Sequence, residues 1–209
     1  MVLIKEACVD TLAEALFTEQ QGANRIELCA QLDEGGLSPT HDLIQKTNLS
    51  LSIPIKVMIR PRGGNFVYSD DELNTMEDEI NQCKIMGITE IVFGVLTKDN
   101  TIDFDVTQTL AKRAVPMKVT FHKAIDEAPN ILSELRKLKS IPEISSILTS
   151  GGQATAKEGA EVLKEMIQIS GNDIVIIPAG KITDENIKEI HELIGANEYH
   201  GRKIVGELP

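Results

Sequence analysis

Short runs of β-branched and other apolar residues alternate with longer amphipathic segments along the whole chain. This alternation is typical of parallel strands that are joined by crossover helices. The first strand-to-helix turn, Cys8-Val9-Asp10-Thr11, has no glycine-rich dinucleotide-binding pattern, which argues against an open doubly wound sheet. A count of eight strands therefore predicts an α/β fold, a TIM-type (β/α)8 barrel. The expected strands cover residues 2–8, 24–29, 55–60, 90–94, 117–122, 145–149, 174–178 and 196–200.

The segments between these strands carry helix-start signals and apolar stripes. Thr11 and Glu14 form a capping-box pattern, in which two side chains satisfy free backbone N–H groups of a first helical turn. Ser69 and Glu72 repeat the pattern, and Gly87 marks the end of that helix. Further stripes begin near residues 129, 156 and 187, and the weakest helix signal lies at 38–47. Only nine residues follow the last strand, so the last helix of the barrel is expected to be short or missing.

Composition predicts a single domain over residues 1–209. A chain with 42% hydrophobic and 25% charged residues can bury one large core. The net charge of −11 argues against a nucleic-acid partner or an anionic membrane surface. No stretch approaches the ~18 apolar residues of a membrane span, and the start of the chain lacks a signal-peptide pattern. The three cysteines have no paired metal-finger spacing, which favours reduced thiols and a cytoplasmic location.

Strand parity predicts a polar barrel interior. Side chains alternate between the two faces of a strand, so Ile26 and Leu28 should face the helices while Glu27 and Cys29 face inward. Barrel interiors normally pack branched apolar residues. Because burial of an unpaired charge costs several kcal/mol, the inward charges must pair with one another, bind a ligand or line a wet cavity. The ionisable residues expected inside are Glu6, Glu27, Lys56, Arg60, Lys118, His122, Glu198 and His200.

Several long motifs occur in order along the chain: EACVD at 6–10, GANRIELCA at 22–30, EGGLSP at 34–39, MIRPRGGNFVY at 58–68, TFHKAID at 120–126 and ILTSGG at 147–152. Together they resemble the CutC family, and the resemblance covers essentially the whole chain. It implies a cytosolic barrel that is linked to copper tolerance. It also implies that the two cysteines matching Cys8 and Cys29 bind Cu(I).

Cys8 and Cys29 form a candidate copper site on chemical grounds as well. Each ends a strand with inward parity, two residues after a glutamate. Adjacent strands lie ~4.8 Å apart, which brings the two sulfurs within reach of one ion, and soft thiolates suit Cu(I). The alternative is that both cysteines only fill space in the core, as free cysteines commonly do. Space filling is the expected role of Cys83, which lies in a helix stripe.

A second class of function, an enzyme acting on a small phosphorylated or carboxylate substrate, stays open. Its candidate acid–base residues are Glu27, His122, Glu198 and His200, which with Glu6 could alternatively hold a divalent metal. Its candidate anion-binding groups are Arg60 and Arg62, at the end of the third strand, and the turn of Ser150, Gly151 and Gly152. Each candidate also has a purely structural explanation. The histidines could be hydrogen-bonded within a polar core, and the turn could use its N–H groups to bond its own backbone.

The missing last helix bears on assembly. Without it, the outer faces of the first and last strands, including Tyr199 and Leu3, would be uncovered. Contiguous apolar surface is rarely left in water, and residues 201–209 are too few for an ordinary helix. A second copy docking there would bury this face, so the sequence predicts a homodimer. The other expected partner is a metal ion or a small anionic molecule.

Overall fold

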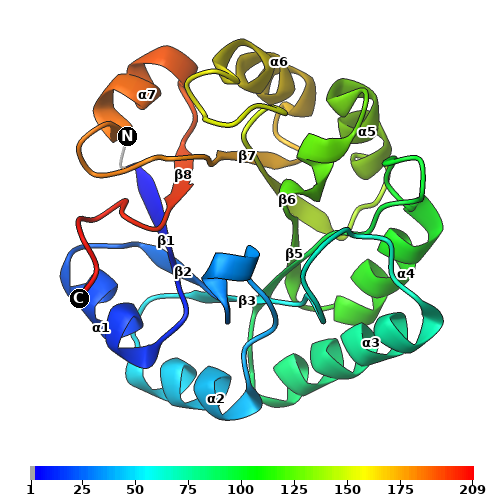
Figure 1. Ribbon diagram of the computed structural model, residues 1–209, viewed down its shortest axis with the longest axis horizontal. Coiled ribbons are helices and arrows are strands. Elements are labelled where there is room, and N and C mark those ends of the chain that lie inside the picture. Colours follow the sequence, from blue (N-terminus) through cyan, green and yellow to red (C-terminus); the bar gives the residue numbers. More distant parts are fainter. Residues whose placement is uncertain (1–2) are drawn as a thin grey trace.

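The computed structural model describes residues 3–209 and shows the predicted TIM-type barrel, with strands inside a ring of helices (Figure 1). The eight strands are parallel, and neighbours pair in the order β7-β6-β5-β4-β3-β2-β1-β8. Strands β7 and β8 approach each other without a hydrogen-bonded ladder, so the barrel is nearly closed. Val2, the first residue of the expected first strand, lies outside the described residues.

Strands and helices alternate as predicted, with shifts of a few residues at their ends. The strands are β1 (Ile4–Val9), β2 (Arg25–Leu28), β3 (Ile55–Met58), β4 (Glu90–Phe93), β5 (Lys118–Phe121), β6 (Ile144–Thr149), β7 (Val175–Pro178) and β8 (Glu198–Gly201). The helices are α1 (Leu12–Gln20), α2 (His41–Ser50), α3 (Asp70–Ile85), α4 (Phe104–Ala114), α5 (Ile131–Leu138), α6 (Ala160–Ser170) and α7 (Ile187–Ile194), with the short 3₁₀ helices η1 (Leu32–Glu34) and η2 (Lys123–Glu127). None of the helices in this part of the chain combines the length and the apolar character that crossing a membrane requires.

The two predicted capping boxes form to different extents. At the start of α3, Ser69 and Glu72 make both reciprocal bonds between side chain and backbone. At α1, Thr11 Oγ1 accepts a bond from the backbone N–H of Glu14 at 3.1 Å. The Glu14 carboxylate instead accepts from the backbone N–H of Asp10, also at 3.1 Å. Both helices therefore begin where the sequence predicts, but only α3 has the complete motif.

Helix α4 has no counterpart among the helices that the apolar pattern predicts. Its buried stripe consists of Thr107, Leu110, Ala111 and Ala114. Only Leu110 is a large apolar residue, so no stripe of large apolar side chains marks this segment in the sequence. Helix α6 begins at Ala160, a few residues after the expected start near 156, because a turn fills the interval.

The clustering of buried side chains confirms the predicted strand parity. Outward residues such as Ile26 and Phe121 belong to the main core between the strands and the helices. Cys8, Cys29 and Met58 form a separate cluster inside the barrel. The helix ring thus holds the strands by apolar packing, and the inward positions are left for polar side chains and for the candidate site.

No helix follows β8 in the described residues, as predicted, but the face expected to be exposed is covered. Tyr199 is 0% exposed, and its hydroxyl accepts a hydrogen bond from the backbone N–H of Ala196 at 2.9 Å. Helix α7 lies against it through His191, and Ile204 and Val205 of the C-terminal segment are buried as well. The prediction of an uncovered Tyr199 is therefore wrong, because α7 and the C-terminal segment replace the missing helix. The expected exposure of this face therefore no longer supports a homodimer, and the homodimer stays a prediction.

Candidate functional site

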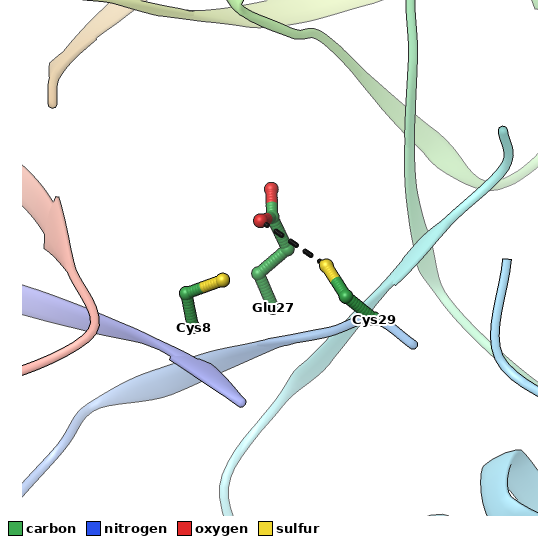
Figure 2. Close-up of side chains that lie close together, drawn as sticks. All are labelled: Cys8, Glu27 and Cys29. Atoms are coloured by element: carbon green, nitrogen blue, oxygen red, sulfur yellow. Dashed lines mark hydrogen bonds between the residues drawn. The ribbon is translucent and has the colours of Figure 1, made fainter. Parts of the chain in front are cut away.

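The carboxyl ends of β1 and β2 bring two cysteines and a glutamate together. Cys8 lies opposite Glu27 in the parallel register, and Cys29 follows directly after β2. Figure 2 shows the Glu27 side chain between the two cysteine side chains. One ligand atom from each of the three residues lies within 4.8 Å of the others, and all three residues are buried. Cys29 Sγ donates a weak hydrogen bond to Glu27 Oε2 at 3.6 Å.

His200 connects this cluster to a carboxylate deeper in the barrel. Its Nδ1 lies 2.8 Å from Glu6 Oε1, and its Nε2 lies 3.8 Å from Glu27 Oε2. Glu6 Oε2 also pairs with Lys56 Nζ at 3.0 Å and with Arg25. The polar interior that strand parity predicts is therefore present, and its charges are largely paired with one another.

Glu198 and Lys118 begin strands β8 and β5, so they lie at the opposite, amino-terminal end of the barrel. Glu198 bonds Arg25 there, and both residues line a cavity of about 100 Å³ together with Lys118. The structure thus places Glu198 away from Glu27 and His200, with which it was grouped as an acid–base candidate. Lys118 was expected inside the barrel, but it is exposed, because it lies at this open end.

The electrostatics of the cluster favour a thiolate at Cys8. A hydrogen bond with Cys29, opposed by burial and supported by His200, lowers the pKa of Cys8 to about 5. Burial acts to lower the pKa of His200, but the charge of Glu27 and the hydrogen bond with Cys8 raise it well above its usual value. At neutral pH an imidazolium at His200 therefore stands beside a thiolate at Cys8.

The surroundings raise the pKa values of both Glu27 and Cys29. Burial, only partly offset by the charge of His200, raises the pKa of Glu27 to about 8. The hydrogen bond with Cys8, together with burial, raises the pKa of Cys29 well above its usual value. A metal ion that binds both sulfurs would therefore displace the proton of Cys29.

A cavity of about 130 Å³ opens beside the cysteines at the carboxyl end of the barrel. Its other walls include Arg60, Phe66 and His122, and the His122 ring lies 4.8 Å from the Phe66 ring between centroids. His122 Nδ1 accepts a hydrogen bond from the backbone N–H of Ala124 at 3.2 Å. Burial and the positive charge of Arg60 lower the pKa of His122 to about 3, so the ring is neutral. The sequence did not predict that Phe66 would lie in this wall.

The two predicted anion-binding arginines differ in position. Arg60 lines the cavity, but its Nη1 donates to backbone carbonyl oxygens of residues 34–36 and its Nη2 donates to Gly64 O at 2.9 Å. These bonds hold the loops around residues 34–36 and 64 together at the carboxyl end of the barrel. Arg62 is absent from the cavity walls and pairs with Glu72 at 2.6 Å. Most of the donor groups of both arginines are thus already used within the protein.

The turn at residues 150–152 binds a carboxylate of the protein itself. The backbone N–H groups of Ser150 and Gly152 donate to the Asp126 carboxylate at 3.0 and 2.9 Å. Gly151 N–H donates to Thr149 Oγ1 at 2.9 Å. An external anion at this turn would have to displace Asp126. The sequence did not single out Asp126 as a partner of the turn, because the two segments are far apart along the chain.

Comparison with known proteins finds relatives along nearly the whole chain. A sequence model of the CutC family matches residues 3–205. A human copper homeostasis protein cutC homolog is 41% identical over 197 residues, which cover 94% of this chain and 72% of the relative. A family protein CutC from Enterococcus faecalis is 36% identical and is covered along 100% of its length by 97% of this chain.

Solved structures agree with the sequence relatives. The crystal structure of a copper homeostasis protein CutC from Streptococcus agalactiae matches with a TM-score of 0.92 at 30% identity, over 97% of this chain and 100% of that one. Enzymes such as oxaloacetate acetylhydrolase, at 11% identity and a TM-score of 0.67, share the fold alone.

Proposed function

This chain belongs to the CutC family of copper homeostasis proteins, and from that premise we propose that it binds one Cu(I) ion through Cys8 and Cys29. The observation that carries this proposal is the approach of both sulfur atoms and a Glu27 oxygen to within 4.8 Å of one another. Thiolate sulfur is a soft ligand and suits Cu(I), whereas hard cations such as Mg²⁺ and Ca²⁺ prefer oxygen. Copper is here the cargo of the site.

The surroundings of the two sulfurs suit a soft monovalent cation. Met58 and Leu32 pack against the cysteine pair, so apolar side chains shield the sulfurs from water on that side. Two thiolates around Cu(I) carry a net charge of −1, and a buried charge needs a partner. The imidazolium of His200 supplies that partner. We also propose a cytosolic setting, which keeps thiols reduced, and the three cysteines of this chain are free.

Anaerobic titration with Cu(I) against a chromophoric Cu(I) chelator tests the proposal. We expect the wild-type chain to take one equivalent from the chelator, because both sulfurs reach the same ion. The double variant Cys8→Ala/Cys29→Ala should lose this site. Copper-bound wild type should also resist unfolding more, by about 4 kcal/mol when free Cu(I) is about 1,000 times the Kd.

Cys83 provides the matched control, because it is a buried thiol in α3 and is not part of the cluster of Cys8, Glu27 and Cys29. Cys83→Ala should bind Cu(I) as tightly as wild type. Unchanged copper binding in the Cys8/Cys29 double variant, or equal loss in Cys83→Ala, would rule out the assignment of the two mouth cysteines as ligands.

A further inference from the structure

The cavity of about 130 Å³ at the carboxyl end of the barrel, called the mouth cavity below, has polar groups that the copper site does not use. His122 is 4% exposed and Arg60 is 5% exposed, and both line this cavity. His122 Nε2 and Arg60 Nε are buried and have no hydrogen-bond partner within residues 3–209. Buried polar groups in native proteins are nearly always hydrogen-bonded, so two such atoms in the wall of one cavity point to a ligand.

Both atoms are hydrogen-bond donors. His122 Nδ1 accepts a bond from the N–H of Ala124, so the proton of the neutral ring sits on Nε2. Arg60 Nε is a donor as well, since a guanidinium group has donors and no acceptor. The terminal nitrogens of Arg60 are held by backbone carbonyl oxygens such as Gly35 O and Gly64 O, so the guanidinium group is locked in place. The cavity wall therefore presents these two donors and a fixed guanidinium group, beside the side chains of Lys123 and His200.

Apolar side chains form part of the remaining wall, beside Glu27, Lys123 and His200, and the space is small. Phe66 and Leu148 line the cavity, and the Arg60 guanidinium lies 4.8 Å from the centre of the Phe66 ring. The volume of about 130 Å³ is well below the ~300 Å³ of the smallest drug-sized pockets and close to cavities of ~150 Å³ that hold benzene. A ligand of this size has only a few heavy atoms. A short carbon chain suits the apolar side chains of the wall.

We propose that the mouth cavity binds a small monocarboxylate of about two to four carbons. Its carboxylate accepts hydrogen bonds from His122 Nε2 and Arg60 Nε, and its carbon chain lies against Phe66 and Leu148. This site goes beyond the copper function, because its donors are His122 and Arg60, although Cys8 and Cys29 also line the cavity. It also differs from the anion site predicted from the sequence, because neither Arg62 nor the turn at 150–152 takes part.

The direct test uses the full wild-type chain after removal of metal by a chelator. Acetate, lactate and pyruvate are titrated while the ring signals of the four histidines are followed by ¹H–¹⁵N NMR. We expect the His122 Nε2 signal to shift with a saturable dependence on at least one acid. His41 and His191 do not line the cavity and should not move. Because this experiment needs no variant, it stays decisive even if substitutions in the wall unfold the protein.

Variants of His122 test the role of the donor, with isothermal titration as the measurement. His122→Leu removes the donor and should weaken carboxylate binding about tenfold or more. His122→Gln keeps an N–H at the end of the side chain and should restore most of the affinity. Cys83→Ala changes a buried thiol outside the cavity walls and should bind the carboxylate normally.

Three results would overturn the proposal. The first is the absence of a saturable His122 shift with all three acids. The second is wild-type affinity in His122→Leu. The third is equally tight binding of acetamide and acetate, since the neutral amide has the same shape but lacks the charge that the Arg60 guanidinium favours.

Discussion

His200 stands between Glu6 and Glu27, and this position sets the protonation of the cysteine pair. Burial acts to raise the pKa of Glu6, but the charge of Lys56 and the hydrogen bond with His200 hold it well below its usual value. The ionised Glu6 in turn supports a charged imidazolium 2.8 Å away. The charge beside Cys8 is therefore supported in part by Glu6, which is not one of the proposed copper ligands.

At the residue scale, we expect Cys8 to titrate in the acid range in the copper-free protein. Its pKa of about 5 follows from the hydrogen bond with Cys29 and from His200, both of which favour the thiolate over the buried thiol. The thiolate absorbs in the ultraviolet, so the absorbance should rise with pH around this value. Cys8→Ser should lose the rise, and His200→Gln should move it to higher pH.

Cys83 serves as the internal control for this titration. Burial raises the pKa of Cys83 to about 12, so it contributes no thiolate in the acid or neutral range. Cys83→Ser should therefore leave the absorbance curve unchanged. A flat signal for wild type through the acid range would show that Cys8 stays a thiol, and an unchanged midpoint in His200→Gln would remove the histidine as the cause.

At the scale of elements, the inward positions were predictable but the contacts at the strand ends were not. Alternation along a strand dictates which side chains face the barrel interior, so Cys8, Glu27 and Cys29 could be grouped from the sequence alone. Each loop contact instead joins segments far apart in the chain. Arg60 donates hydrogen bonds to carbonyl groups near residue 35, and Asp126 accepts hydrogen bonds from the turn at 150–152. No local pattern specifies which donor meets which acceptor in such pairs.

Asp126 ties η2 to the end of β6. Its carboxylate accepts bonds from the backbone N–H groups of Ser150 and Gly152, and Lys123 Nζ lies 2.7 Å from it. Burial acts to raise the pKa of Asp126, but Lys123 and the hydrogen bonds lower it below its usual value. The folded state therefore favours the ionised carboxylate. This contribution to stability is present above the unfolded pKa of 3.8 and is lost as the pH falls through the lower folded value.

Asp126→Asn should lower the free energy of unfolding by about 1–3 kcal/mol at neutral pH, because the amide cannot accept every bond that the carboxylate accepts. Urea unfolding measures the change. The difference from wild type should shrink in strong acid, where the wild-type carboxyl group is protonated too. Asp173→Asn is the control, since that aspartate is exposed, and it should change stability by less than about 0.5 kcal/mol. Equal stability of Asp126→Asn and wild type at neutral pH would contradict the proposed tie.

At the scale of the whole molecule, the barrel covers its own surface more completely than the missing helix suggested. Among residues 3–209, the most exposed large apolar side chains are Leu49 and Ile85, at 80% and 77%, in α2 and α3. Single apolar residues on a surface are ordinary and do not require a partner. The homodimer predicted from the sequence therefore depends on measurement alone, and light scattering against the chain mass of 22.9 kDa decides it.

The seam between β7 and β8 interrupts the ring of hydrogen-bonded strands in the described part of the chain. Strand β8 pairs with β1 alone, and β7 pairs with β6 alone. Backbone groups of a parallel strand point alternately to its two neighbours, so each of these strands lacks a partner for one side. A cavity of about 200 Å³ lies at the seam, lined by residues such as Val175 and Asn197. Local opening should therefore begin here.

We expect native-state hydrogen exchange to show this order of opening. Amides of β7 and β8 should exchange through local opening, at a lower free energy than amides of β2 to β4, which have strands on both sides. Arg25 holds Glu198 at the start of β8, so Arg25→Met should lower protection in β8 further. The same variant should leave β4 and β5 unchanged relative to global stability. If β8 amides exchange only with global unfolding, at the free energy of β3, then side-chain packing closes the seam as firmly as hydrogen bonds close the rest of the barrel.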